Sequence, residues 1–272
     1  MGAGRIKWRA NIYQMHLEIQ GSVRHTEECV AKIESRPILY RHQRLNYKMS
    51  FSVSNSHSPT GAGWTRDLPK TYVPTGEPSV DRLAFFHIIE RLKTQKRTGW
   101  IKSKVPAPES IADHMHRMSV LALCTSDTTL DIPKCVMMAV VHDLAEAIVG
   151  DIAPWEGISR EEKAAREREG MRSMLLDMLH DTPAAKRIEV LWEEYEAQIT
   201  PEARFIKDLD RLEMALQASE YERAHAESSG RLQPFFDSSL PKIKHSEVAQ
   251  WGSDLDKERR DHWNRVAKEV PE

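Results

Sequence analysis

The sequence predicts an all-α fold, a single bundle of about six to eight helices. Apolar residues recur three and four positions apart in successive segments between residues 78 and 268, as they do on the buried face of a helix. Several of these segments begin with Ser, Thr or Asp, which are typical helix N-caps. Apolar and polar residues alternate over no more than a few positions, so no long β-strand is expected.

The composition is that of an ordinary globular protein: 272 residues, 40% hydrophobic, 29% charged, with a formal net charge of −2. No strongly basic field indicates a nucleic-acid polymer as partner, and no apolar run approaches the roughly 18 residues that cross a bilayer. Cys29, Cys124 and Cys135 match no zinc or disulfide spacing. They favour a reducing compartment, so we expect a cytoplasmic location, with the nucleus as the alternative.

Residues 1–77 are predicted to be a poorly ordered N-terminal extension. The first fifty residues carry nine Lys or Arg against four Asp or Glu, and the text from Ser50 is rich in Ser, Gly, Pro and Asn. The basic residues admit an organelle presequence, but the acidic ones argue against it. We assign this segment no chemistry, and we expect the folded domain to span residues 78–268.

The first helix is predicted after Pro78, with Ser79 as its N-cap. Its expected apolar stripe consists of Leu83, Phe86, Ile89 and Leu92, and Phe85 and Ile88 widen it.

A basic segment, KTQKRTGWIKSK, follows this helix and contains Arg97 and Trp100. Its lysines are typical of solvated cations that complement the negative end of a helix dipole. For Arg97 and Trp100 a second interpretation is equally good. In it the guanidinium binds a phosphate group, and the indole forms a wall beside it.

Glu109 or Ser110 is expected to begin the next helix, which carries two histidines. His114 and His116 lie about 200° apart around a helix, so one of them should face the core. His114 lies beside Met115 and is the inward candidate. It could be a core histidine bonded to backbone, or a ligand.

The most informative stretch is AVVHDLAEAIVGDI, residues 139–152, which holds four ionisable residues in a very apolar run. Such groups are costly to bury unless they are paired or bind a metal. On one helix His142, Asp143 and Glu146 would point into a single pocket. A lone polar group here would more often be a satisfied core residue, but four within ten residues indicate a metal site.

The boundaries of this helix follow from its ends. Asp131 or Thr129 is expected to begin it, and Gly150 is expected to end it, with Asp151 at the mouth of the pocket.

The second half of the chain predicts further helices. Ser159 should cap a helix over 159–180 whose Met-rich face belongs to the core, and a short helix should follow over 184–198. The text around LQPFFDSSLP is expected to be irregular, with Phe235 and Phe236 anchoring it to the core. A charged helix over about 242–268 closes the chain.

Thr200 and Pro201 are expected to open the helix that carries Asp208 and Asp210. Next to the apolar stripe, Asp210 is predicted to face inward and Asp208 to face water. The alternative for Asp210 is an ordinary ion pair with a basic residue of its own helix.

The order of His114, His142–Asp143 and Asp210, each on a predicted helix, resembles the H…HD…D signature of the HD superfamily of metal-dependent phosphohydrolases. Beyond these four residues, the sequence is similar to the HD-domain 5′-deoxynucleotidases in five stretches: RTGW, PESIADHMHRM, HDLAEAIVGDI, the EEK segment and KDLDRLEMALQASEYE. The resemblance covers about residues 79–255. It implies a single HD-domain helical bundle with a metal site in its centre.

The resemblance also implies a role for each matching residue. His114, His142, Asp143 and Asp210 would hold a divalent metal ion. Glu146 and Asp151 match acidic positions that shape the phosphate and water site and that can help to hold a second ion. The backbone carbonyl of Ile152 would also face that ion.

On the substrate side, Arg97 matches the residue that binds the 5′-phosphate. Trp100 matches a tryptophan that lies against the sugar, where a 2′-hydroxyl would clash. In the bacterial relatives the Arg and Trp are adjacent, whereas Thr98 and Gly99 intervene here, as in the eukaryotic branch.

The implied activity is hydrolysis of deoxyribonucleoside 5′-monophosphates to deoxyribonucleosides and phosphate. The expected cofactor is a divalent cation, Mn²⁺, Co²⁺, Mg²⁺ or Zn²⁺. Two imidazoles and two carboxylates suit Mn²⁺, Co²⁺ or Zn²⁺ better than a purely oxygen-seeking ion. The metal would polarise the phosphoryl oxygen and lower the pKa of a bound water towards ~7. Glu146 could orient or deprotonate that water, and Arg97 would neutralise charge on the phosphoryl oxygens.

Two other interpretations are open at this stage. Another HD phosphohydrolase could act on cyclic nucleotides, nucleoside triphosphates or ppGpp, for which Lys96, Lys102 and Lys104 supply further cations. A non-catalytic HD binding module would be expected to have lost ligands, and none is missing here. No membrane partner is expected, and a homodimer is implied by the resemblance alone.

Overall fold

The computed structural model describes residues 68–225 and 230–269. Within these ranges all regular secondary structure is helical, and the β-type pairing consists of one isolated bridge between Lys96 and Ser110. The predicted all-α class is therefore confirmed. No helix in the described ranges is both long and apolar enough to cross a membrane. The greater part of the predicted extension, residues 1–67, lies outside the described residues.

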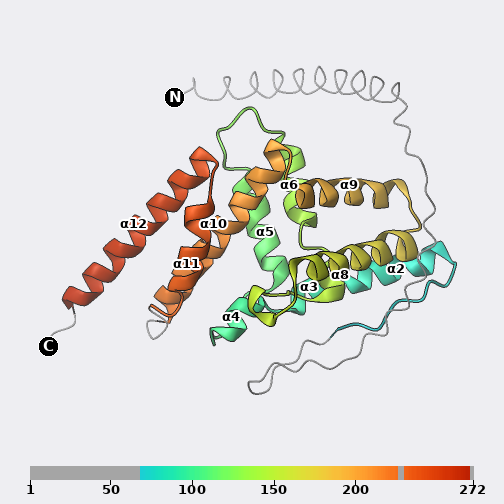
Figure 1. Cartoon of the computed structure of the whole chain (residues 1–272), viewed down its shortest axis with the longest axis horizontal. Helices are drawn as coiled ribbons and strands as arrows, with labels where there is room; N and C mark the ends of the chain where they lie inside the picture. The colour runs from blue at the N-terminus through green and yellow to red at the C-terminus, as the bar shows by residue number, and fades with distance from the viewer. Residues whose placement is uncertain (1–67, 226–229, 270–272) are drawn as a thin grey trace, which may run out of the picture. The chain divides into compact units, whose positions relative to one another are not determined.

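Figure 1 shows the helices in chain order. Eight of those in the described ranges are seven residues or longer, in agreement with the prediction: α2 (Pro78–Ile88), α5 (Ile111–Ala122), α6 (Ile132–Val141), α8 (Arg160–Arg172), α9 (Pro183–Ala197), α10 (Pro201–Ala224), α11 (Gln233–Ser239) and α12 (Ser246–Glu269). The shorter pieces are α3 (Arg91–Thr94), α4 (Thr98–Lys102), α7 (Glu146–Val149), the 3₁₀ turns η1 (Pro154–Glu156) and η4 (Leu240–Lys242), and a π-helical turn, η2 (Ser173–Met178).

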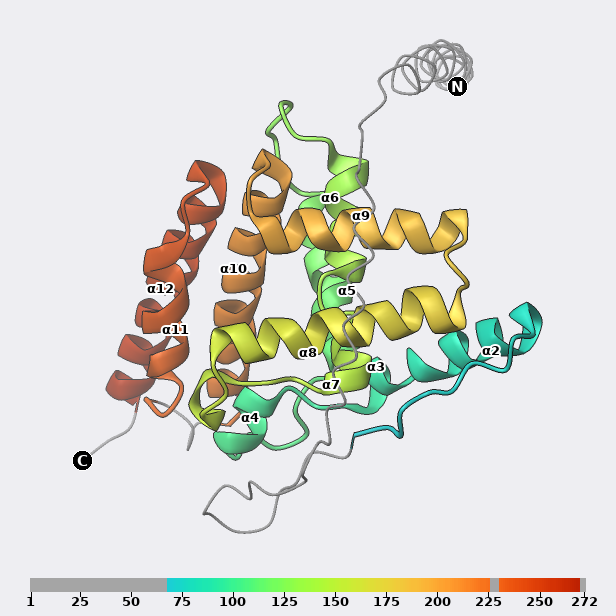
Figure 2. The same ribbon diagram turned by 45° about the vertical axis from the view of Figure 1, so that its right-hand side comes forward.

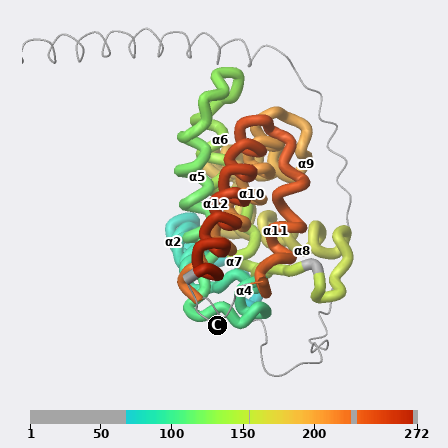
Figure 3. The backbone as a smooth tube through the Cα atoms, turned by 90° about the vertical axis from the view of Figure 1, so that its left-hand side faces the viewer, coloured from blue at the N-terminus to red at the C-terminus, as the bar shows by residue number. Residues whose placement is uncertain are grey.

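The helices α5, α6 and α10 pack against one another and form the centre of the fold. In Figure 2, α8 and α9 run across the direction of α5 and α10. On another side of α10 lie α11 and α12, which Figure 3 shows in front of it. One apolar cluster fills the space between α5, α6, α10, α11 and α12, and a second lies between α2, α5, α7, α8 and η2. Because α5 belongs to both clusters, a polar side chain on it can be buried between them.

Three of the predicted helix starts are confirmed by their hydrogen bonds. Asp131 caps α6, Ser159 caps α8 and Thr200 caps α10, each accepting a hydrogen bond from a backbone N–H three residues on. Ser110 begins α5 with a full capping box.

The first helix differs from its prediction. Pro78 is the first helical residue, so the N-cap is Glu77 and not Ser79. The expected stripe is also wrong in part, since Leu83 and Phe86 are exposed, but Phe85, which was expected to widen it, is buried. The helix ends at Ile88, and the chain turns before α3. A single helical period therefore does not extend from Leu83 to Leu92.

The stretch over 139–152 is not one continuous helix. Helix α6 ends at Val141, and tight i→i+3 bonds link Leu144 N to Val141 O at 3.1 Å and Glu146 N to Asp143 O at 3.0 Å before α7 begins. Gly150 ends α7 with a φ of 74°, which favours glycine, as the sequence predicted.

Two further differences concern the second half of the chain. Residues expected to be irregular form α11, although Phe236 is buried and anchors the segment as expected. Asp208 was expected to face water but is buried, and its Oδ2 accepts hydrogen bonds from Lys244 N and His245 N, each at 2.8 Å. Helical periodicity could not reveal these partners, because they lie on a distant segment.

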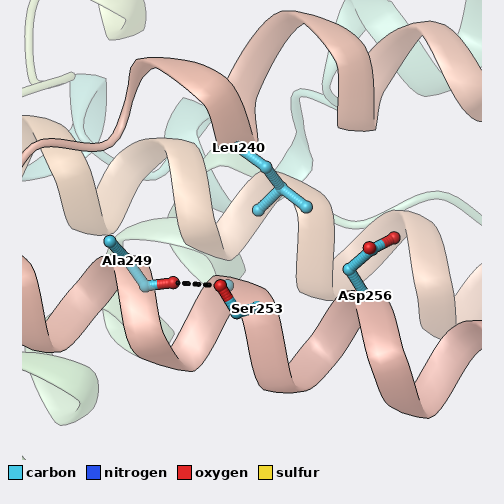
Figure 4. Close-up of a pocket in the computed structure, with 5 residues that line it drawn as sticks. Leu240, Ala249, Ser253 and Asp256 are labelled. Carbon is cyan, nitrogen blue, oxygen red and sulfur yellow. Dashed lines mark hydrogen bonds between the residues drawn. The ribbon is translucent and has the colours of Figure 1, made fainter.

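Helix α12 packs closely on the chain before it. A Cβ atom added at Gly252 would lie 3.2 Å from Leu240 Cδ2 and 3.6 Å from Ile243 Cδ1, so a glycine allows the close approach. Beside this contact is a small surface hollow of about 140 Å³, shown in Figure 4. Its lining residues are Leu240, Ala249, Gly252, Ser253 and Asp256. None of them belongs to the site predicted from the sequence.

Asp81 in α2 holds the preceding segment against the bundle. Its side chain is fully buried and accepts hydrogen bonds from Tyr72 OH at 2.5 Å and from the backbone N–H of Thr75 at 2.9 Å. His180 Nε2 lies 2.7 Å from its Oδ2. Burial acts to raise the pKa of Asp81, but the hydrogen bonds from Tyr72 and Thr75 outweigh it and hold the pKa well below its usual range.

We expect Asp81→Asn to lower the melting temperature by a few degrees at pH 7. A carboxyl whose pKa is depressed in the folded state stabilises the protein above its unfolded pKa, and this contribution is lost as the pH falls below about 4. The difference between the wild type and the variant should therefore shrink at acid pH. Differential scanning calorimetry from pH 3 to 7 tests this, with the exposed Asp254→Asn as control. A difference independent of pH would contradict it.

Candidate metal centre

Side chains from three helices meet between the two apolar clusters. His114 comes from α5, His142 from the C-cap of α6 and Asp210 from α10. One ligand atom of each lies within 4.8 Å of the others. Both imidazoles are buried. His116 is exposed, so the prediction that one of the α5 histidines faces inward is confirmed.

Asp143 joins this group. Its Oδ2 lies 3.1 Å from His142 Nε2 and 3.7 Å from His114 Nε2. Asp210 Oδ1 lies 3.4 Å from His114 Nε2. Two imidazole nitrogens and two carboxylate oxygens therefore converge, although the helix that should have carried His142 and Asp143 ends just before them.

The hydrogen bonds of the two imidazoles indicate what they can bind. Nδ1 of His142 donates to the carbonyl of Ala139 at 2.9 Å, and Nδ1 of His114 lies 2.5 Å from Glu213 Oε2. The Nε2 atoms of both histidines are buried and have no hydrogen-bond partner among the described residues. A buried nitrogen left in this state is costly, whereas an Nε2 whose ring is held at Nδ1 is a common metal ligand. The donor set therefore fits a divalent ion.

The electrostatics favour a cation at the same place. Burial and Arg97 act to lower the pKa of His114, but Glu213 and Asp210 outweigh them and raise it to about 10. Burial raises the pKa of Asp143, but His142 and Arg97 hold it well below its usual range. The carboxylates thus stay ionised and attract positive charge, which a proton on His114 or a metal ion can supply.

Asp210 is oriented by two groups on the side away from His114. Its Oδ2 accepts hydrogen bonds from Lys207 Nζ at 2.8 Å and from Tyr195 OH at 3.3 Å. Burial acts against ionisation, but Lys207 and His114 keep the pKa of Asp210 well below the usual value. The ion pair with Lys207, which the sequence left as an alternative, therefore exists beside the contact with His114.

Glu146 lies on α7 and is 3% exposed. Its Oε2 is buried without a hydrogen-bond partner among the described residues. Burial, and then the negative charges of Asp143 and Asp151, raise its pKa well above the usual value, although Arg97 and Lys163 oppose this. Such a carboxyl holds a proton more tightly than an exposed one and can exchange it with a water molecule or a substrate.

Arg97 precedes the first turn of α4 and lies among the acidic residues. Its Nη1 is 3.2 Å from Asp143 Oδ2. Burial acts to lower its pKa, but the carboxylates of Asp151, Asp143 and Glu146 raise it well above the usual value. The guanidinium is therefore a permanent positive charge beside the converging nitrogens and oxygens.

Asp151 ties α4 to this group. Its Oδ2 accepts a hydrogen bond from Thr98 N at 2.7 Å, and its backbone carbonyl accepts one from Thr98 Oγ1 at 2.7 Å. The next carbonyl, that of Ile152, accepts a hydrogen bond from Lys163 Nζ at 3.1 Å. The structure thus brings Asp151 and Ile152 near Arg97 and Lys163.

Trp100 is enclosed by protein. It is 2% exposed, its Nε1–H donates to Glu109 Oε1 at 2.8 Å, and its ring centroid lies 4.3 Å from that of Phe235 and 5.3 Å from that of Tyr221. Its indole is thus a packed core group three residues after Arg97, and contact with a sugar stays a prediction.

Sequence reasoning missed three residues of this region: Lys163, Tyr195 and Glu213. Glu213 follows Asp210 by three positions and therefore shares its helix face, so this spacing could have identified it. Lys163 lies in the EEK segment that carried the resemblance. The contact between α9 and α10 that brings in Tyr195 has no local signal in the sequence.

Comparison with known proteins gives one consistent result. The family model described as HD domain matches residues 89–250. The 5′-deoxynucleotidase HDDC2 of Bos taurus is 47% identical over 185 residues, which cover 68% of this chain and 89% of that protein. The 5′-deoxynucleotidase hdd1 of Schizosaccharomyces pombe is 41% identical over 190 residues, covering 69% of this chain and 95% of that protein.

Solved structures share the fold. A predicted metal-dependent phosphohydrolase from Magnetospirillum magnetotacticum superposes with a TM-score of 0.54 at 25% identity, covering 68% of this chain and 93% of that one. The PH0347 protein of Pyrococcus horikoshii superposes with a TM-score of 0.51 at 30% identity, covering 65% and 98%. These matches and the converging His and Asp side chains lead to one conclusion: the chain belongs to the HD-domain family, among its 5′-deoxynucleotidases.

Proposed function

We propose that this protein is a metal-dependent 5′-deoxynucleotidase, which hydrolyses deoxyribonucleoside 5′-monophosphates to deoxyribonucleosides and phosphate. The observation that carries the proposal is the pair of buried Nε2 atoms, on His114 and His142, that lack a hydrogen-bond partner within the described part of the chain. They face ionised carboxylates, with the cationic Arg97 beside them. The relatives named 5′-deoxynucleotidases support the reaction and the substrate class.

In this proposal His114, His142, Asp143 and Asp210 hold a divalent ion. Such an ion supplies Lewis acidity to a phosphoryl oxygen and to the attacking water. The histidine nitrogens favour Mn²⁺, Co²⁺ or Zn²⁺ over Mg²⁺. The carbonyl of Ile152 accepts a hydrogen bond from Lys163 and has a second lone pair that could face a second ion.

The chain's own groups complete the reaction. Arg97 binds the 5′-phosphate and neutralises charge on its oxygens as the bond to the sugar breaks. Glu146 accepts a proton from the water whose oxygen attacks phosphorus, and the 5′-oxygen leaves the phosphorus and takes up a proton. Asp151 fixes the first turn of α4 through Thr98, and so the place of Arg97.

The test is phosphate release from dAMP and AMP, measured side by side with protein stripped of metal and supplied with Mn²⁺, Co²⁺, Mg²⁺ or Zn²⁺. Metal-dependent release from dAMP with little from AMP is expected. Equal rates would keep the phosphohydrolase but remove the sugar selectivity assigned to Trp100. No release from either substrate with metal bound would contradict the proposal and favour a cyclic nucleotide, a triphosphate, ppGpp or a binding role.

We expect Arg97→Met to lower kcat/KM for dAMP by about 10²–10³-fold, the usual loss when a group that stabilises transition-state charge is removed. Arg97→Lys should recover part of it, because a lysine keeps the charge but not the two-pronged geometry. Steady-state kinetics of both variants test this. The control is Lys96→Met, which removes the neighbouring cation on an exposed side chain. Equal, small effects of Lys96→Met and Arg97→Met would contradict a phosphate-binding role.

The positions of the other cations near Arg97 in the sequence bear on whether the substrate is a triphosphate. Lys96 and Lys104 are exposed, and Lys102 Nζ lies over the ring of Trp155 at 4.2 Å from its centroid. Among the described contacts, none of these lysines forms an ion pair or hydrogen bond with the residues of the centre, which favours a monophosphate over a triphosphate.

The homodimer, the cytoplasmic location and the domain boundary at residue 78 remain predictions. A dimer could bury the exposed apolar side chains on and next to α5 and α6, which are Val120, Leu123, Met137 and Val140.

A further inference from the structure

Glu213 on α10 is a fully buried carboxylate, yet both of its oxygens are engaged. Oε2 lies 2.5 Å from His114 Nδ1, whereas Oε1 accepts a hydrogen bond from Arg117 Nε at 2.9 Å and forms an ion pair with Arg117 Nη2 at 2.7 Å. A buried charge of this kind is strongly unfavourable unless it is paired and fully hydrogen-bonded. Packing alone therefore does not explain why a carboxylate is buried at position 213.

Arg117 alone does not supply that reason. Its guanidinium also donates to Glu220 Oε2 at 2.9 Å and to Gln217 Oε1 at 2.7 Å, and its side chain is 27% exposed. An arginine at the protein surface with two further acceptors on the same helix needs no buried partner. Glu213 is therefore not buried in order to pair with Arg117. Instead, Arg117 compensates the charge of the buried Glu213.

The two histidines of the centre are held in different ways. Nδ1 of His142 donates to a neutral backbone carbonyl, that of Ala139, within its own helical turn. Nδ1 of His114 faces the charged Glu213 on another helix, 99 residues further along the chain. A carboxylate at Nδ1 orients an imidazole and makes its Nε2 a stronger donor to a metal than a carbonyl does.

We propose that Glu213 and Arg117 form a positioning pair that fixes the ring and the tautomer of His114, so that its Nε2 is presented as a metal ligand. The pair links α5 and α10, the two helices that supply His114 and Asp210, and thereby sets the distance between these two ligands. This inference rests on the proposed function, because it gives Glu213 a role only if an ion binds at Nε2.

The test compares two isosteric variants on the same helix. Glu213→Gln keeps the size of the side chain but removes its charge, and Glu222→Gln is the matched control. Glu222 is also a fully buried carboxylate on α10 paired with an arginine, with Arg259 Nε at 2.6 Å and Nη2 at 2.9 Å, but none of its hydrogen bonds reaches the histidines. Both variants should lose stability, whereas only Glu213→Gln should alter His114.

The first readout is the affinity for Mn²⁺, measured by isothermal titration calorimetry on the full chain. Glu213→Gln is expected to raise the Kd by about 10–100-fold, the range for loss of a carboxylate behind a ligating histidine. Glu222→Gln is expected to leave the Kd within about twofold of the wild type. An unchanged Kd in Glu213→Gln would overturn the inference, and so would an equal loss in both variants. Absence of Mn²⁺ binding in the wild type would instead overturn the proposed function.

The second readout does not depend on the affinity. In protein loaded with Zn²⁺, the Nδ1 proton of His114, which bonds a carboxylate, should resonate further downfield than that of His142, which bonds a carbonyl. In Glu213→Gln this proton should move upfield towards the position of the His142 proton, because the amide oxygen carries no charge. A His114 spectrum identical to that of the wild type would contradict the positioning role.

If Glu213→Gln does not fold, a variant of Arg117, which pairs with Glu213, provides the test. Arg117→Met keeps the aliphatic stem of a partly exposed side chain and removes the compensating charge. It should raise the Kd for Mn²⁺ in the same direction but by less, because Glu213 stays in place. A wild-type Kd in Arg117→Met together with a weakened one in Glu213→Gln would remove Arg117 from the pair.

Discussion

Replacing His142 with alanine is expected to reduce phosphate release from dAMP by more than about 100-fold, because loss of a group that merely supports a ligand already costs roughly 10–100-fold. The imidazole is buried, its Nδ1 bonds the carbonyl of Ala139, and its Nε2 faces Asp143 at 3.1 Å.

The same variant should retain its helix content. His142 follows the last residue of α6, and its side chain makes one hydrogen bond, within that turn. Far-ultraviolet circular dichroism therefore distinguishes a lost site from a lost fold. His116→Ala, on the exposed face of α5, is the control and should keep full activity. Normal turnover in His142→Ala would refute the proposed centre.

The histidine and aspartate pattern was predictable because each residue lies on, or next to, an apolar helix face. His114, His142 and Asp210 each stand beside residues that the periodicity places in the core, and a polar group in that position must have a partner. The structure brings the ligand atoms of all three within 4.8 Å. The helix caps were predictable for a similar reason, since Asp131 and Thr200 act within three residues of their own position.

What could not be predicted depends on contacts between distant segments. Asp208 was assigned to solvent because nothing nearby in the chain indicates that it bonds the backbone at Lys244 and His245. The break between α6 and α7 also has no local cause such as proline. It places Glu146 on a separate short helix. The core position of Trp100 likewise depends on Phe235 and Tyr221, which come from far along the chain.

The charges around the centre explain why so many ionisable groups tolerate burial. Arg97, Lys163 and Lys207 each bond a carboxylate or a carbonyl beside the histidines. They offset most of the repulsion among the acidic residues, so the remaining negative potential is directed at the two Nε2 atoms. Glu146 is the exception, because its Oε2 has no hydrogen-bond partner in the described ranges.

Glu146→Gln is therefore expected to separate activity from stability. Glutamine cannot take a proton from water, so phosphate release should fall by about 10²–10⁴-fold, the usual contribution of a general base. The stability of the fold should increase, because the variant removes a buried carboxyl whose ionisation is opposed by burial and by Asp143 and Asp151. Steady-state kinetics and thermal melts of the same preparation measure both effects, with the exposed Glu169→Gln as control.

The pH dependence of the increase in stability of Glu146→Gln tests whether the raised pKa of Glu146 causes it. Because the folded state raises the pKa of Glu146, the native protein binds a proton that the unfolded chain has already released above about pH 4.5. The stability of the wild type should therefore fall as the pH rises from about 4.5 towards the raised pKa, and Glu146→Gln lacks this loss. In the presence of a chelator, the melting temperature of the variant should exceed that of the wild type by an amount that grows with pH. A difference that stays constant, or that reverses sign, would show that Glu146 is not held as a buried carboxyl of raised pKa. An active Glu146→Gln would show that another group accepts the proton.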